Sequence, residues 1–257
     1  MIRLSNAGFD YIEVSSFVSP KWVPQLADAK DVFAGIQRKK GVTYASLVPN
    51  TVGFDSALSC KSNEIAIFGA ASESFSKKNI NCSIDESLQR FGQVMRLAEQ
   101  NHIPVRGYIS CVVACPYEGT VKPEMVLRVT KKMLQMGCRE ISLGDTIGQG
   151  TPEAVQKLLS VICNEIPVEK LAVHFHDTNK KALDNLTVAL NEFKIRTVDS
   201  SVGGLGGCPY AGPGVSGNVS TESVLRHLAK LNYLSRGNIS VDEVEKIGKW
   251  IRDQMLN

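Results

Sequence analysis

Strand-like and helix-like segments alternate along almost the whole chain, and this alternation limits the possible folds more than any other feature. Short β-rich runs end at a polar or glycine-containing break, and a helical pattern of apolar residues follows. The predicted strands are Tyr11–Phe17, Thr43–Pro49, Glu64–Ala70, Val105–Val113, Glu140–Asp145, Leu171–His176 and Thr197–Val202. Repeated βα units predict a parallel sheet joined by right-handed crossovers.

The helical segments carry recognisable start signals. Pro123 and Pro152 each suit the first turn of a helix, and Ser220 suits an N-cap. The other predicted helices are Val23–Lys39 and Ile84–Asn101, and a last one covers Val241–Met255. The even spacing and the length of 257 residues favour a TIM (β/α)8-type barrel over an open doubly wound sheet.

The start of the chain does not match a complete barrel of this type. About seven strands can be counted, and the first residues look like the end of a helix, at Ala7 and Gly8, that runs into a strand. We therefore expect a single domain over residues 1–257 that lacks the first barrel strand and carries an extra C-terminal helix. Such a barrel exposes two strand edges, so we expect poor solubility or association, with a homo-oligomer as one possible form.

Composition excludes several classes of protein. The chain is 43% hydrophobic and 21% charged, with a net charge of +3, so a small anionic substrate is compatible with it and nucleic acid is not favoured as a partner. No apolar run is long enough for a membrane span, and no signal or transit peptide opens the chain. Seven cysteines without a CxxC pair indicate a reducing compartment. The expected absence of a targeting segment fits the cytoplasm of a bacterium, and equally the mitochondrial matrix of a eukaryote if the start is truncated.

The stretch from Leu171 to Asn185 contains the clearest functional signal. His174 and His176 stand two residues apart at the end of a predicted strand, so both side chains point to one face of the sheet. In α/β proteins active sites are built at these carboxyl ends. The pair is compatible with a metal site, because imidazole is a common metal ligand, and equally with hydrogen-bonded polar residues.

Other polar residues follow predicted strands and would share that end of a barrel. They are Glu13, Asp145, Asp199 and Ser201. A glycine-rich loop from Ser200 to Asn218 suits an active-site lid, and it carries Cys208, which is either a reactive or an inert thiol. Asn218 either caps the next helix or offers an amide oxygen to a hard cation.

Several runs of this sequence together resemble the hydroxymethylglutaryl-CoA lyases, within the family of metal-dependent TIM-barrel lyases and Claisen-type synthases. The runs are SFVSPKWVPQLAD, IFGAASESFSKKNINCSI, VRGYISCVVACPYEG, EISLGDTIGQGTP, AVHFHDT and VDSSVGGLGGCPYAGPGVSGN. The synthases share the HxH pair but not GLGGCPYA, so the resemblance favours the lyases.

The resemblance implies cleavage of 3-hydroxy-3-methylglutaryl-CoA to acetyl-CoA and acetoacetate, as in leucine degradation and ketone-body formation. It implies that His174, His176 and Asn218 are ligands of Mg²⁺ or Mn²⁺. Cys208 would be the catalytic thiol, with Glu13 and Asp145 as polar groups that support the substrate and the catalysis. The Lys77–Asn79 stretch (Lys77, Lys78 and Asn79) is expected in a loop near the CoA moiety.

One departure from the family pattern bears on activity. The RDGLQNE-like motif of the family's first strand, which supplies an arginine for the enolate and a further metal ligand, is absent from this sequence. An oriented cation of this kind contributes several kcal/mol to the transition state. We therefore expect severely impaired turnover, and the alternative function is a truncated barrel that binds a metal or CoA esters without turnover.

Overall fold

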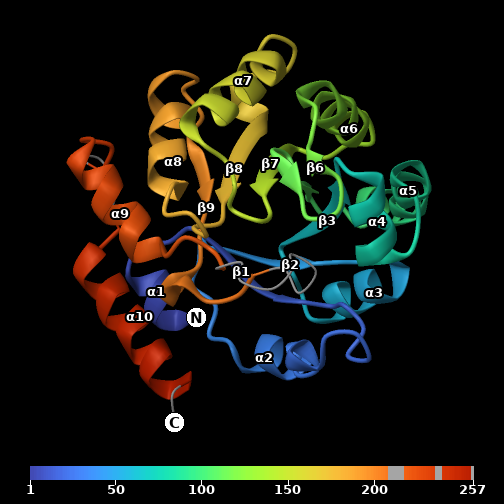
Figure 1. Ribbon diagram of the computed structural model, residues 1–257. Coiled ribbons are helices and arrows are strands. Elements are labelled where there is room, and N and C mark those ends of the chain that lie inside the picture. The colour runs from blue at the N-terminus through green and yellow to red at the C-terminus, as the bar shows by residue number, and fades with distance from the viewer. Residues whose placement is uncertain (208–216, 235–238, 256–257) are drawn as a thin grey trace.

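A parallel sheet of seven strands lies at the centre of the protein in the computed structural model, which describes residues 1–207, 217–234 and 239–255 (Figure 1). The order of its strands across the sheet is β1-β2-β3-β4-β7-β8-β9, so strands that follow each other in the sheet also follow each other in the chain. Their bounds are β1 (Tyr11–Ser16), β2 (Thr43–Leu47), β3 (Glu64–Ala70), β4 (Val105–Ser110), β7 (Glu140–Asp145), β8 (Leu171–Phe175) and β9 (Thr197–Asp199). A short antiparallel hairpin, β5 (Ala114–Cys115) with β6 (Gly119–Thr120), follows β4.

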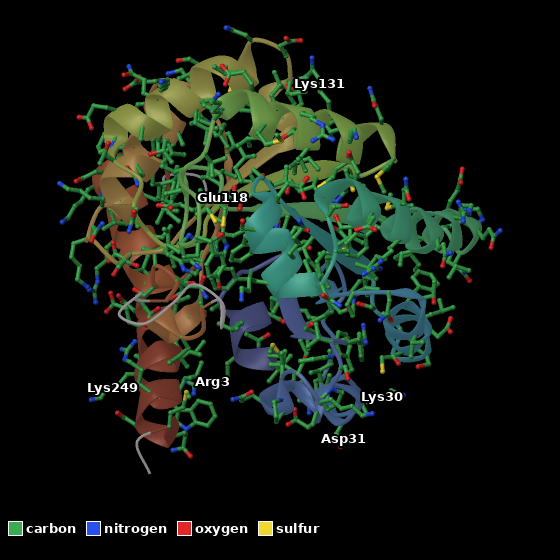
Figure 2. The ribbon with its side chains drawn as sticks, turned by 45° about the vertical axis from the view of Figure 1, so that its right-hand side comes forward. Arg3, Lys30, Asp31, Glu118, Lys131 and Lys249 are labelled. Carbon is green, nitrogen blue, oxygen red and sulfur yellow. The ribbon has the colours of Figure 1, made fainter. Side chains whose placement is uncertain are left out.

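Helices surround the sheet on its outer side (Figure 1). They are α1 (Ile2–Asn6), α2 (Ala29–Gly35), α3 (Thr51–Ser59), α4 (Glu73–Ile80), α5 (Ile84–Gln100), α6 (Pro123–Gln135), α7 (Pro152–Cys163), α8 (Ala182–Asn191), α9 (Thr221–Lys230) and α10 (Val241–Met255), with 3₁₀ turns η1 (Pro24–Leu26), η2 (Val168–Lys170) and η3 (Val202–Gly204). Charged side chains such as Lys131 of α6 and Lys249 of α10 point outward from this layer (Figure 2).

Side chains of β4 show that the sheet is curled like a barrel wall. Arg106 of β4 makes an ion pair of 2.8 Å with Asp199 of β9, three strands away in the sheet order. Its guanidinium also lies 5.7 Å from the ring centre of Tyr11 in β1, three strands away on the other side. A flat sheet would hold strands three places apart at about 14 Å, so these contacts require strong curvature.

The hydrophobic core fills the space between the sheet and the helices. Side chains alternate along each strand, so residues such as Ile65, Ile67, Ile141 and Leu143 face outward and are fully buried under the helices. A second, smaller cluster joins Ala7 to Leu225, Val244 and Ile247, and so attaches α1 to α9 and α10. The expected barrel-like α/β fold is therefore confirmed, in the form of a curled seven-stranded parallel sheet.

Local sequence signals explain where the helices begin. Ser83 caps α5: its hydroxyl accepts the Glu86 N–H at 3.2 Å, and the Glu86 carboxylate accepts the Ser83 N–H at 2.8 Å. This reciprocal pair is a capping box. Pro123 and Pro152 occupy first-turn positions of α6 and α7, as the sequence predicts.

Two expectations about helices were wrong. The segment predicted as one helix over Val23–Lys39 is divided into η1 and α2, and the chain is extended from Ile36. Arg38 donates to the carbonyls of Cys60 and Lys61, both at 2.8 Å, which holds this segment against the end of α3 instead of in a helix. The Lys77–Asn79 stretch lies in α4 and not in a loop, because Ser72 caps the helix and it continues to a left-handed Asn81.

Three further observations concern the fold as a whole. The described helices include none that is both long and apolar enough to cross a membrane. Within the described residues, β1 and β9 form the outer edges of the sheet and each pairs with one other strand. The expected helix-to-strand start is confirmed, because α1 ends at Asn6 and β1 begins at Tyr11.

Candidate metal centre and active site

The HxH pair lies at the carboxyl end of β8, and its two rings face the same side. The ring centres of His174 and His176 are 5.2 Å apart. His174 is half-buried, and His176 is 5% exposed at the point where β8 has just ended. The two histidines therefore lie on one face of the strand, as the sequence pattern predicts. Phe175, between them, points to the other face and packs in the hydrophobic core.

A second segment, 42 positions further along the chain, brings Asn218 to the same place. Asn218 forms an isolated antiparallel bridge with His176, and the neighbouring Val219 N–H donates to the Phe175 carbonyl at 3.3 Å. The side-chain amide N–H of Asn218 donates to the Leu205 carbonyl at 3.0 Å. This bond orients the amide and leaves its Oδ1 free to face another partner.

Two polar atoms of this cluster are buried without a hydrogen-bond partner among the described residues. They are Nδ1 of His176 and Oδ1 of Asn218. An unsatisfied buried polar atom costs about 1–3 kcal/mol, so such a pair at one place calls for a ligand. An imidazole nitrogen and an amide oxygen both offer lone pairs to a divalent cation, so the residues present fit a metal ion.

The electrostatics of the cluster keep both imidazoles neutral near pH 7. Burial, and next the neighbouring His174, lower the pKa of His176 to about 4. Burial also lowers the pKa of His174, partly against the attraction of the Asp199 carboxylate. A neutral imidazole has a free lone pair, so neither ring needs to lose a proton before it binds a metal.

The described residues place no three His, Cys, Asp or Glu side chains in an arrangement that could hold a metal. The donors that meet at this site are two imidazoles and the amide of Asn218. A cation bound here would therefore take its remaining ligands from substrate or water, as hard cations commonly do.

A polar network fills the concave side of the sheet beside the histidines. Arg106, which is 2% exposed, pairs with Glu140 at 2.6 Å and with Asp199 at 2.8 Å. Ser142 donates to the second oxygen of Asp199 at 2.6 Å. Since Asp199 is paired in register with His174 across β8 and β9, the network lies directly next to the first imidazole.

Glu13 belongs to this network through Tyr108. The Tyr108 hydroxyl of β4 donates to the Glu13 carboxylate of β1. Glu13 is exposed on the concave face, yet the atoms around it partly desolvate its carboxyl, and this effect, followed by the charge of Asp199, raises its pKa. A carboxyl with a raised pKa takes up and returns a proton more readily near neutral pH.

The Asp145 carboxylate hydrogen-bonds to backbone N–H groups and not to the described histidines. It is fully buried at the end of β7, where its two oxygens accept the N–H of Gly150 at 2.8 Å and of Gln149 at 3.3 Å. Burial raises its pKa, and these backbone bonds act against that shift. The observed contacts make Asp145 an organiser of the turn after β7.

The remaining predicted site residues lie elsewhere. Lys77 and Lys78 are exposed on α4 and Asn79 is half-buried there. Cys208 lies outside the described residues, so its predicted role as the catalytic thiol stays a prediction. Cys111 and Cys115 are buried cysteines that form no disulfide with another described residue, as expected for core cysteines.

Arg106, Tyr108, Glu140 and Ser142 are site residues that the sequence analysis missed. A signal for them exists, because strands of a parallel sheet covered on both faces are normally continuous apolar runs. In VRGYIS, and in the first four residues of EISLGD, polar residues instead occupy alternate positions. That alternation indicates a strand with one polar, inward face.

The chain is similar to known proteins in family, sequence and structure. The family model described as HMGL-like matches residues 1–251. The mitochondrial hydroxymethylglutaryl-CoA lyase of Bos taurus is 57% identical over 228 residues, which are 89% of this chain and 70% of that protein.

Two solved structures have the same fold over nearly the whole chain. The HMG-CoA lyase of Brucella melitensis has a TM-score of 0.94 at 47% identity, covering 99% of this chain and 89% of that one. An HMG-CoA lyase of Acinetobacter baumannii, solved in complex with coenzyme A and 3-methylmalate, has a TM-score of 0.91 at 32% identity, covering 98% and 81%.

Proposed function

Because the chain belongs to the HMGL-like family, we propose that it cleaves 3-hydroxy-3-methylglutaryl-CoA to acetyl-CoA and acetoacetate, the activity for which its lyase relatives are named. The observation that supports this proposal most directly is the cluster of His174, His176 and Asn218, with two buried polar atoms left unpartnered. These three residues would hold the divalent cation.

Each residue of the cluster has a task that follows from its surroundings. A bound Mg²⁺ or Mn²⁺ would supply a Lewis acid for the hydroxyl and carboxylate oxygens of the substrate. His174 and His176 are neutral near pH 7 and present lone pairs without prior deprotonation. Asn218 presents an oxygen whose direction is set by its bond to the Leu205 carbonyl.

Proton transfer would fall to the groups around the cluster. The Glu13 carboxyl has a raised pKa and is oriented by the Tyr108 hydroxyl that donates to it, so it can accept a proton from a substrate hydroxyl and hold it. Asp145 would support the site by shaping the turn that follows β7. Cys208 would donate the proton to the departing acetyl-CoA carbon, the role that the resemblance implies for it.

The substrate class follows from the relatives. The Acinetobacter baumannii lyase binds coenzyme A, and we propose an acyl-CoA ester as the substrate of this chain. Lys77, Lys78 and Asn79 of α4 are proposed contacts of the CoA moiety, since the first two are exposed cations. A relative named mitochondrial and a bacterial one are both similar, so mitochondrial matrix and bacterial cytoplasm remain the two predicted compartments.

A second candidate is a protein that binds the metal or CoA esters without turnover. The observation in its favour is that the described cluster combines two imidazoles with one amide and includes no carboxylate ligand. Binding and turnover therefore have to be measured separately.

The test uses the purified 257-residue chain, Mn²⁺ or Mg²⁺, and 3-hydroxy-3-methylglutaryl-CoA. We expect acetoacetate, detected by coupled reduction with NADH, and its loss on chelation or in His176→Asn. His227→Asn is the matched control, because His227 contacts Thr187 on the outer helices at 2.7 Å.

The outcomes separate the two candidates. A slow but metal-dependent rate matches the impaired turnover expected from the sequence. Calorimetry that shows Mn²⁺ binding without any acetoacetate favours the binding protein, and the absence of both rejects the proposed metal site.

A further inference from the structure

The direction of the Asn218 amide depends on the segment Val202–Gly207. The side-chain N–H of Asn218 donates to the Leu205 carbonyl at 3.0 Å, and its backbone N–H donates to the Gly206 carbonyl at 3.1 Å. Both bonds end on this one segment. A shift of Leu205 would therefore turn the amide and take Oδ1 away from the imidazole of His176.

The segment has little capacity to hold its own shape. Gly203, Gly204 and Gly206 have φ angles of 80°, 67° and 79°, in the left-handed region that glycine adopts most readily. Glycine has more conformational freedom to lose than any other residue, so a segment in which four of six residues are glycine needs support from outside.

That support comes from a buried carboxylate on α9. The Glu222 side chain is 5% exposed, and one of its oxygens accepts the N–H of Gly203 at 2.9 Å. The other oxygen accepts from the guanidinium of Arg252 on α10 at 2.8 Å. Glu222 thus connects two helices to the backbone of the glycine segment.

The packing of α10 is adapted to this carboxylate. A Cβ at Gly248 would lie 1.9 Å from Oε1 of Glu222, so any larger residue at this position would displace the carboxylate from its observed place. Gly203 lies against the same turn, where a Cβ would be 3.5 Å from the Gly248 carbonyl oxygen. Glu222 therefore occupies a place shaped by η3 and α10 together.

We infer that Glu222, held by Arg252, is a positioning residue that fixes the Val202–Gly207 segment and, through Leu205 and Gly206, the metal-binding direction of the Asn218 amide. The inference rests on the metal site of the proposed function. Its physical basis is a continuous chain of contacts from α10 through Glu222 and the glycine segment to Asn218.

A simpler role for Glu222 is to join α9 to α10 by an ion pair. Another pair already does this: Arg226 and Glu245 meet at 2.5 Å, with side chains 59% and 35% exposed. The Arg226–Glu245 pair connects the same two helices, and neither side chain hydrogen-bonds to the glycine segment, which makes Glu245 the matched control. Loss of either pair would loosen the two helices, but only loss of Glu222 would release Asn218.

The experiment compares Glu222→Gln with Glu245→Gln in the full chain. Gln keeps the size of the side chain but loses its charge and one acceptor oxygen. We expect Mn²⁺ affinity by calorimetry, well below the melting temperature, to fall about tenfold or more for Glu222→Gln, as for other residues that orient metal ligands. For Glu245→Gln we expect less than a twofold change.

A second readout needs no metal. In metal-free protein, hydrogen exchange of the amides of residues 201–207 and 217–221 should accelerate for Glu222→Gln and stay at the wild-type rate for Glu245→Gln. Arg252→Lys keeps a cation for Glu222 and should retain most of the affinity, whereas Arg252→Gln should lose part of it. If Glu222→Gln does not fold, the comparison of Arg252→Lys with Arg252→Gln tests the inference in its place.

The outcomes are distinguishable. If the wild type binds Mn²⁺ and Glu222→Gln binds it equally well with unchanged exchange, the inference is wrong and the proposed function stands. If both variants weaken Mn²⁺ binding to the same degree, Glu222 acts only through the joining of the helices and the inference is again wrong. A wild type that binds no Mn²⁺ overturns the proposed metal site and this inference with it.

Discussion

His176 combines deep burial with a ring nitrogen that has no partner among the described residues. Burial keeps the imidazole neutral, and the fold places it beside His174 and Asn218. Folded proteins rarely leave a buried polar atom without a hydrogen-bond partner or a ligand. The same burial that prepares the ring to bind a metal should make the metal-free protein sensitive to acid.

The pH dependence of stability tests this point. The pKa of His176 is about 4 in the folded protein against 6.5 for a free histidine, so between these values the unfolded chain binds a proton that the folded chain does not. The free energy of unfolding should therefore fall as the pH drops through this window, by at most about 1.4 kcal/mol per pH unit for this group.

The measurement is urea unfolding in a chelator at pH 7, 5.5 and 4.5 for wild type and His176→Asn. The variant lacks the titrating ring, so its stability should decline less over this range. Equal slopes for the two proteins would contradict the lowered pKa.

Strand β4 connects the most distant parts of the sheet. Arg106 reaches Glu140 on β7 and Asp199 on β9, and its guanidinium lies over the rings of Tyr11 and Tyr108. With two carboxylates around one cation, each charge in this group depends on the others. β4 therefore contributes to the curvature of the sheet through its side chains as well as through its backbone pairing.

Removal of the Arg106 charge should be costly. We expect Arg106→Gln to lower the free energy of unfolding by about 3–5 kcal/mol, because Glu140 and Asp199 would stay largely buried without their cation. Lys131→Gln, which breaks a half-exposed pair with Glu165, should cost less than about 1 kcal/mol. Chemical denaturation measures both, and similar losses for the two variants would show that the network adds no special stability.

The two outer strands of the sheet bear on how the protein behaves in solution. Among the described residues, β1 and β9 each have a strand neighbour on one side, and an unpaired strand edge offers N–H and carbonyl groups to another chain. The association expected from the sequence therefore stays a prediction, and the structure indicates β1 and β9 as the strands through which it would occur.

Sedimentation velocity over a range of protein concentrations tests that prediction. We expect the average mass to rise with concentration, and amides of β1 and β9 to exchange more slowly as it rises. A monodisperse monomer at all concentrations, melting in one cooperative transition, would contradict it.

Much of the fold and part of the site could be predicted from local patterns. The bounds of β3 and β7 were predicted to the residue, and His174 and His176 were expected on one face because a strand repeats every two residues. The break between η1 and α2 was missed, because it depends on the bonds of Arg38 to a distant turn. Contacts of this kind leave no trace in hydrophobic periodicity.

The order of strands and helices, and the placing of two imidazoles at a strand end, follow from the sequence because both depend on neighbours within a few residues. The meeting of Arg106 with Tyr11 and Asp199, and of Asn218 with His176, depends on how far the sheet curls and on how α9 and α10 hold the glycine segment. Long-range packing sets that curvature, and so the tertiary structure alone brings these groups together.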